Sequence, residues 1–117
     1  MRFIHENKNI QSAIDEDNYN GIVKKIGLSM TKILKKRVLQ IKASDNFAIY
    51  LKTGLGKPHP LDGELEGCYG ISITANFRLV IKPITNAYDI KSLSQCDTIL
   101  VKGVVDYHGG KCNWILP

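Results

Sequence analysis

The sequence predicts an α+β fold in which helices pack on one face of an antiparallel β-sheet. Three observations predict it. Apolar residues follow a helical spacing in the first half of the chain. After Pro58 the spacing changes to the alternation typical of strands. A length of 117 residues suits one domain with one core, so we expect residues 1–117 to fold as a single unit.

The first half contains an expected short strand at residues 1–4 and then helical segments. Residues 7–26 carry apolar side chains at helical spacing, but an acidic and amide cluster and Gly21 interrupt them, which predicts two short helices or one interrupted helix. Residues 28–43 have the cleanest helical pattern. Ser44 is expected to be the N-cap of a third helix that runs to about Lys52.

The second half begins with two alternating runs, residues 68–74 and 77–82, whose short connection predicts a β-hairpin. Residues 83–97 form a connection of undetermined structure. Residues 98–108 are again typical of a strand, and period-two alternation predicts that one face of it is formed by Ile99, Val101, Val105 and Tyr107.

The charge is concentrated in one part of the chain. The net charge is +5, yet residues 24–57 hold nine basic residues and one acid. We call the lysines of this segment the basic stripe; such a stripe suits a polyanion, although a solvated helix face has the same pattern. Candidate RNA- or ribosome-binding residues are Lys24, Lys25, Lys32, Lys35, Lys36, Lys42 and Lys57, with Lys82 beyond the stripe.

Composition excludes several classes of protein. A hydrophobic content of 44% argues against a disordered chain. No apolar run is long enough to cross a bilayer and no secretory signal is seen, so we expect a soluble cytoplasmic protein that does not bind membranes. The three cysteines have no Cys-x-x-Cys spacing and are expected to be reduced thiols.

A small set of residues could cleave RNA without a metal or another cofactor. Such cleavage needs a base for the 2′-hydroxyl proton, a cation for the phosphate charge and an acid for the leaving 5′-oxygen. Histidine suits the proton transfers, and arginine suits the phosphate because its planar fork stays charged. The chain supplies His59, Arg78, Asp106, Tyr107 and His108.

Other readings of these residues stay open at this point. Each could be an ordinary surface or core residue. A metal site built from His59, Asp106 and His108 is a further alternative, although no ligand spacing in the sequence supports it.

Three segments resemble a known family. Residues 56–73 resemble the His-x-Leu-x-Gly stretch of HigB-type toxins, the plasmid-maintenance killer toxins of the RelE/ParE superfamily. Residues 75–81 are similar to their aromatic–Arg–hydrophobic strand, and residues 104–108 to their closing Asp-Tyr-His. The three segments occur in the family's order.

The resemblance implies a RelE-like fold, with N-terminal helices packed on a twisted antiparallel β-sheet. It also implies an endoribonuclease toxin that cuts messenger RNA in the ribosomal A site without a metal. It also implies a cognate HigA-like antitoxin with a helix-turn-helix, through which alone the toxin would reach operator DNA. By position, His59, Asp106, Tyr107 and His108 match the catalytic residues and Arg78 matches the phosphate-contacting arginine. Asp106 would orient a histidine and Tyr107 would help to place the nucleotide.

Some positions depart from the family pattern. The second arginine that some relatives carry before the hairpin turn is absent, and position 70 is Gly where Ser is common. The resemblance also leaves two alternatives: a ParE-like non-enzymatic inhibitor of a protein such as DNA gyrase, and a basic protein that binds RNA without cutting it. Retention of His59 and His108 favours the nuclease.

Overall fold

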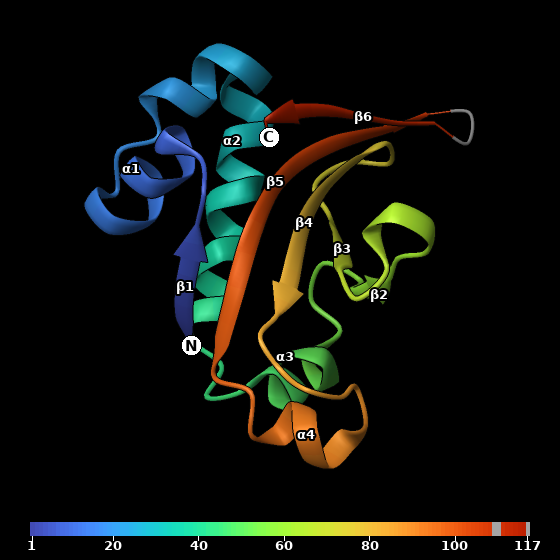
Figure 1. Ribbon diagram of the computed structural model, residues 1–117. Helices are drawn as coiled ribbons and strands as arrows, with labels where there is room; N and C mark the ends of the chain where they lie inside the picture. The colour runs from blue at the N-terminus through green and yellow to red at the C-terminus, as the bar shows by residue number, and fades with distance from the viewer. Residues whose placement is uncertain (109–110, 117) are drawn as a thin grey trace.

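The computed structural model describes residues 1–108 and 111–116 (Figure 1). Its helices are α1 (Lys8–Glu16), α2 (Asn20–Lys42), α3 (Phe47–Thr53) and α4 (Ile90–Ser94), with a short 3₁₀ turn, η1 (Gly63–Leu65). Its strands are β1 (Arg2–His5), β2 (His59–Pro60), β3 (Tyr69–Ser72), β4 (Phe77–Pro83), β5 (Thr98–His108) and β6 (Lys111–Leu116). The mixed α+β class is as predicted, with helices in the first half and most strands in the second.

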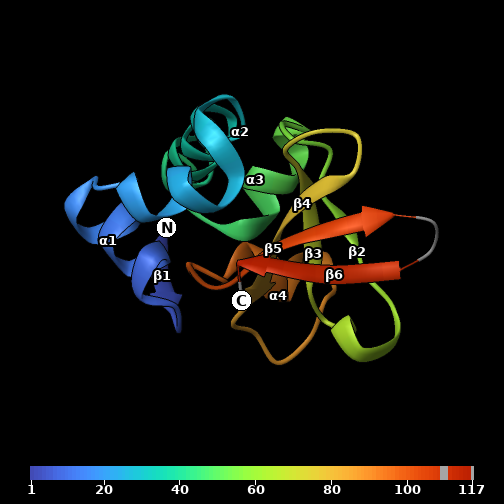
Figure 2. The same cartoon turned by 90° about the horizontal axis from the view of Figure 1, so that it is seen from above.

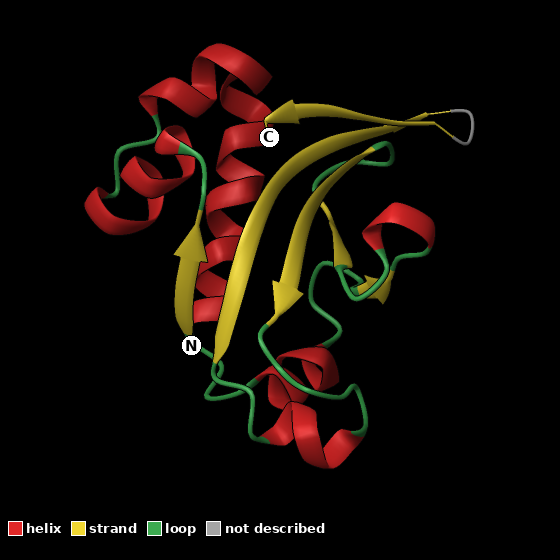
Figure 3. Cartoon of the chain, viewed as in Figure 1, coloured by secondary structure: helices red, strands yellow, loops and turns green. Residues whose placement is uncertain are grey.

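The strands form one mainly antiparallel sheet around β5, the longest strand. On one side of β5 lie β4, β3 and β2 in that order, all antiparallel. On the other side, β1 pairs in parallel with the first part of β5 and β6 pairs antiparallel with its last part. Figure 3 shows how β5 curves along the whole sheet and carries β1 and β6 at its two ends.

The helices begin and end where local chemistry allows. Asn7 caps α1 by accepting from the backbone N–H groups of Asn9 and Ile10. Within α2, Gly27 has a φ of +83°, so this helix is two segments joined at a glycine. The chain is also not helical between α1 and α2, which confirms that residues 7–26 are not one helix. Gly54, with a φ of +66°, ends α3 close to the expected end near Lys52.

The predicted cap of α3 is wrong. Asn46 is the N-cap, and its side chain accepts from the N–H of Ile49. Ser44 is buried, and its hydroxyl donates to the carbonyl oxygen of Gln40 in the last turn of α2. Asn46 accepts the free N–H of the first turn of α3 because the hydroxyl of Ser44 is already bonded to α2.

The two faces of the sheet pack against different parts of the chain. The helices cover one face and enclose the main core, which includes Leu79, Ile81, Ile99 and Val104. The loop that contains β2 and η1 covers the other face and encloses a second, smaller core formed by Leu61, Cys68, Val80 and Val105. Figure 2 shows α2 and α3 on one side of the sheet and the η1 loop, in yellow-green, on the other. We call the second face the loop face.

A β-bulge changes which residues of β5 belong to each face. The predicted face of Ile99, Val101, Val105 and Tyr107 is wrong beyond Val101. Val80 pairs with Gly103 and Ile81 with Val101, so Lys102 is the extra residue of a bulge. Gly103 adopts a φ of +142°, which only glycine adopts readily. Because of this insertion Val104 joins the helix-covered core, while Val105 joins the loop face.

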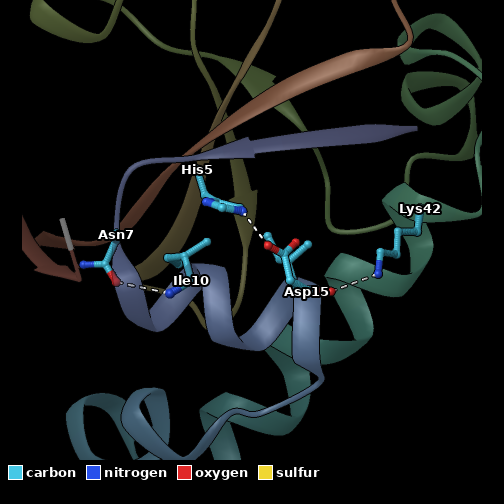
Figure 4. Close-up of polar contacts among 6 residues, drawn as sticks. His5, Asn7, Ile10, Asp15 and Lys42 are labelled. Atoms are coloured by element: carbon cyan, nitrogen blue, oxygen red, sulfur yellow. Dashed lines mark hydrogen bonds and ion pairs between the residues drawn. The ribbon is translucent and has the colours of Figure 1, made fainter.

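Polar contacts join β1 to α1, and α1 to α2. The Nε2 atom of His5 lies 3.2 Å from a carboxylate oxygen of Asp15 in α1, and Figure 4 shows both side chains pointing toward each other. The ammonium group of Lys42 in α2 donates to the carbonyl oxygen of Ile14 in α1.

In the part of the chain that the structure describes, no helix is long and apolar enough to span a membrane.

Candidate functional site

A pocket of about 220 Å³ opens on the loop face, between the β2 segment and strands β4 and β5. Its lining includes three of the five predicted catalytic residues: His59, Arg78 and Tyr107, together with Pro60, Leu61 and Asp62. These residues come from three segments far apart in the sequence. The hairpin register and the β5 bulge bring them to one place.

His59 is positioned by the edge strand β2 and by a glycine. It pairs with Gly70 of β3, and a Cβ at position 70 would lie 3.4 Å from Cε1 and 3.5 Å from Nε2 of the imidazole. The ring therefore packs over Gly70, at contact distance from the place of a Cβ. The other ring nitrogen, Nδ1, lies 3.3 Å from the carbonyl oxygen of Lys57. A carbonyl only accepts hydrogen bonds, so Nδ1 is the donor in this contact, and in the neutral imidazole Nε2 is then the acceptor.

Arg78 points to the same face because it pairs with Ser72 and Val105, whose side chains share that face. Its guanidinium donates to the carbonyl oxygen of Thr74 at 2.6 Å, across the hairpin connection. This bond fixes the side chain at one end. Arginine has five N–H donors, so the remaining ones are available to an anion in the pocket.

Tyr107 lies on the loop face, and 44% of its surface is exposed. Asp106 is its neighbour in β5 and points to the opposite face, where it pairs with Phe77. Its Oδ1 is buried and has no hydrogen-bond partner among residues 1–108 and 111–116. The structure therefore does not bring Asp106 together with His59 or Arg78.

His108 is the last residue of β5 and its backbone pairs with Lys111. Its side chain lies outside the described residues, so its predicted part in the site stays a prediction. The alternative metal site loses one pair of ligands, because His59 and Asp106 occupy opposite faces of the sheet. Within the described residues, no three His, Cys, Asp or Glu side chains are grouped so that they could hold a metal ion.

The predicted RNA-binding lysines divide into two groups. Those of α2 lie on the helix layer, which covers the face opposite the pocket: Lys24, Lys25, Lys32, Lys35, Lys36 and Lys42. Lys35 forms an ion pair with Asp17 at 3.1 Å. Lys57 precedes β2, and Lys82 lies on the loop face of β4, close enough to Cys68 to act on its thiol electrostatically.

The thiols beside the pocket are not activated. Burial raises the pKa of the Cys68 thiol, and the nearby Lys102 and Lys82 offset this only in part. Burial also raises the pKa of the Cys112 thiol. Both groups are therefore neutral at pH 7, which argues against a cysteine nucleophile.

Sequence reasoning missed several residues that shape the site. Asp62 lines the pocket although no motif pointed to it. Gly103 decides that Tyr107 faces the pocket; a lone glycine within a strand pattern is a known sign of a bulge and could have indicated this. Trp114, to which no motif pointed, lines a neighbouring cavity.

The fold and the pocket define a small α+β protein with a histidine, an arginine and a tyrosine gathered on the loop face of its sheet. No protein-family model and no curated protein sequence matches the chain. Among solved structures it is similar to a YoeB/ParE toxin from Agrobacterium tumefaciens, with a TM-score of 0.50, 20% identity, and coverage of 97% of this chain and 98% of that one. At this identity the likeness shows the fold. The predicted RelE-like architecture is thus confirmed, and the likeness does not single out the HigB-type group.

Proposed function

We propose that the protein is the toxin of a toxin–antitoxin pair and acts as a metal-independent endoribonuclease on messenger RNA in the ribosome. The observation that carries this proposal is the pocket that gathers His59, Arg78 and Tyr107 on one face of the sheet. The likeness in fold to a YoeB/ParE toxin supports the toxin role.

In the proposed reaction each group has one task. Nε2 of His59 takes the proton of the 2′-hydroxyl, and the 2′-oxygen attacks the adjacent phosphorus. The guanidinium of Arg78 holds the phosphate oxygens as their charge increases. The 5′-oxygen leaves with a proton donated by an acid of the pocket, for which we propose the phenol of Tyr107, and a 2′,3′-cyclic phosphate remains. Asp106 has no part in this proposal because it lies on the other face.

The remaining parts of the proposal follow from the resemblance. The chain acts as one domain in the cytoplasm and a HigA-like helix-turn-helix antitoxin neutralises it. The lysines of the basic stripe bind ribosomal RNA from the helix side while the loop face cuts the message. RNA would then contact the protein on both faces, which is consistent with a narrow site such as the ribosomal A site.

The second candidate is a ParE-like inhibitor that binds a protein target without catalysis. The same likeness in fold supports it, since the printed description of the solved structure joins both toxin types. What favours the nuclease is the chemistry of the pocket: a histidine with a free Nε2 beside an arginine has a use in phosphodiester cleavage and none in a purely steric inhibitor.

The test is induction of the protein in growing cells, with the 5′ ends of cellular messenger RNA mapped before and after. We expect growth arrest and new 5′ ends within translated frames, both abolished by Arg78→Ala and His59→Ala. Lys91→Ala, an exposed lysine of α4 away from the pocket, is the control and should leave both unchanged. Growth arrest without new ends would support the inhibitor, and full toxicity of both pocket variants would show that the assigned site is wrong.

A further inference from the structure

A second cavity adjoins the pocket on the loop face. It has a volume of about 210 Å³ and shares Leu61, Asp62 and Tyr107 with the first pocket. Its other lining residues are Glu64, Leu65, Cys112 and Trp114. The two cavities form one groove, which continues from His59 and Arg78 past Tyr107 to β6.

The sheet register places an aromatic side chain in line with Arg78. Arg78 pairs with Val105, and Val105 pairs with Trp114, so the three residues form one row across β4, β5 and β6 on the same face. Two strand spacings separate the ends of the row, roughly 10 Å. Adjacent nucleotides of a single strand can bridge such a distance.

Tyr107 and Trp114 are diagonal neighbours on adjacent strands, because Tyr107 pairs with Cys112. Diagonal neighbours of this kind lie roughly 7–8 Å apart, which leaves room for one flat ring between two others. Both rings are exposed to solvent, Tyr107 by 44% and Trp114 by 40%. The ring contacts found among the described residues join other aromatic pairs, Phe47 with Tyr50 and with Tyr69.

Charge decides which part of a nucleotide this cavity accepts. Asp62 and Glu64 line it, and the Asp62 carboxylate makes no capping bond to η1. Asp62 is common to both cavities, whereas Arg78 lines only the first and Glu64 only the second. Carboxylates repel a phosphate, so the phosphate remains at Arg78 and the base enters the cavity that holds Glu64. Carboxylates also accept hydrogen bonds from the exocyclic amino groups of adenine, cytosine and guanine, which uracil lacks.

We propose that the cavity is a nucleobase subsite, where a base next to the phosphate at Arg78 stacks on Trp114 and Tyr107. Asp62 and Glu64 then select bases with an exocyclic amino group over uracil. The proposal rests on the proposed nuclease function and adds to it a defined specificity. Stacking on an aromatic ring is sequence-tolerant, so the carboxylates supply the discrimination and Trp114 supplies the affinity.

The chain itself provides the reporter, because Trp114 is its single tryptophan. The probes are short oligoadenylate and oligouridylate with 2′-O-methyl groups, which cannot be cleaved, and a chain of the same length without bases. We expect oligoadenylate to quench the fluorescence of Trp114 and to bind more tightly than oligouridylate. The chain without bases should leave the fluorescence unchanged.

Variants separate the contributions. Trp114→Ala should weaken binding of oligoadenylate by about 5- to 150-fold, and Trp114→Phe should restore most of it because the ring is kept. Replacing both Asp62 and Glu64 by Ala should reduce the preference for oligoadenylate over oligouridylate. Glu66→Ala is the matched control, since this exposed acid of the same loop does not line the cavity.

Two kinds of failure are distinguishable. If the wild-type protein cuts messenger RNA in cells while oligoadenylate leaves Trp114 unquenched, or binds Trp114→Ala as tightly as wild type, the subsite is wrong and the nuclease stands. Equal affinity for the two oligonucleotides would overturn the role of the carboxylates. If the wild-type protein neither binds these probes nor produces new 5′ ends, the proposed function fails and the subsite fails with it.

Discussion

The imidazole of His59 packs against Gly70, so that a Cβ at position 70 would lie in van der Waals contact with the ring, 3.4 Å from Cε1. A Cβ there would also lie 3.2 Å from a methyl carbon of Leu61, which covers the same strand. The glycine therefore belongs to the geometry of the pocket.

Gly70→Ala should crowd the methyl carbon of Leu61, which lies 3.2 Å from the new Cβ, and shift the neighbouring imidazole of His59 slightly. We expect RNA cleavage to fall by up to about 10-fold, because small misplacements of a reacting group lower the rate. The measurement is cleavage rate together with the proton NMR signal of His59 Hε1, which should shift. His5, fastened to Asp15 on the other side of the molecule, is the internal reference and should keep its signal. Unchanged cleavage with an unmoved His59 signal would refute the contact.

Arg78→Lys should reduce cleavage by at least about 100-fold even though the charge is kept. Lysine cannot offer the planar fork that binds two phosphate oxygens. It also cannot both donate to the Thr74 carbonyl oxygen and present a fork to the phosphate. Single-turnover cleavage on programmed ribosomes measures this. Lys82→Ala, which removes another positive charge from the same strand, is measured for comparison. A fully active Arg78→Lys would mean that charge alone suffices at this position.

Gly103→Ala should cost about 1–3 kcal/mol of unfolding free energy, because alanine is strained at a φ of +142°, and should also abolish cleavage. The matched control is Gly54→Ala, at a φ of +66° at the end of α3. It should lower stability while keeping activity, since it leaves the β5 bulge intact. Urea unfolding and cleavage assays of both variants check this. Equal activity of the two would show that the bulge does not set the position of Tyr107.

The stability of the protein should fall between about pH 10 and pH 12. Burial raises the pKa of the Tyr50 phenol to about 12 from an ordinary value of 10.0, so the folded state holds this proton more tightly than the unfolded state does. The contribution is complete below pH 10 and is lost as the pH passes through about 12.

Tyr50→Phe tests the source of that loss. At pH 7 the variant should be about 1 kcal/mol less stable, because the hydroxyl bond to the Leu55 carbonyl oxygen is gone. Above pH 10 the difference from wild type should shrink. Chemical denaturation across this pH range measures it, and a constant difference up to pH 12 would contradict the assignment.

Charge reversal of three exposed stripe lysines, Lys24, Lys32 and Lys36, to Glu should weaken ribosome binding steeply with rising salt. The same number of charge reversals at exposed basic residues outside the basic stripe, Arg2, Lys8 and Lys91, gives a control of the same net charge. Sedimentation with ribosomes at several salt concentrations distinguishes them. Equal losses in the two variants would mean that net charge matters and the location of the stripe does not.

The sequence predicted the elements well and the faces of β5 poorly. Helical and alternating periods are local, so the central helix and the hairpin of β3 and β4 follow directly from them. A bulge depends on pairing with another strand, so period-two alternation beyond Val101 placed Val105 on the wrong face. The cap of α3 failed for a similar reason: Ser44 is bonded to Gln40, in a different helix.

The candidate site was predictable only in part. His59, Arg78 and Tyr107 were named from their chemistry and meet in one pocket. Asp106 was named for its place two residues from His108, and it faces away because of the same bulge. Asp62 and Trp114 carry no motif; they reach the groove through a loop and an added strand whose positions only the folded chain reveals.

The strand that carries His59 is also the free edge of the sheet beyond β3. Open edges invite pairing with a second chain and hence aggregation. Here the edge strand has two residues, Pro60 has no N–H to offer, and Pro58 precedes it. The prolines that hold the histidine over Gly70 thus also keep other strands from adding to this edge and covering the pocket. The same two residues therefore support the proposed activity and favour solubility.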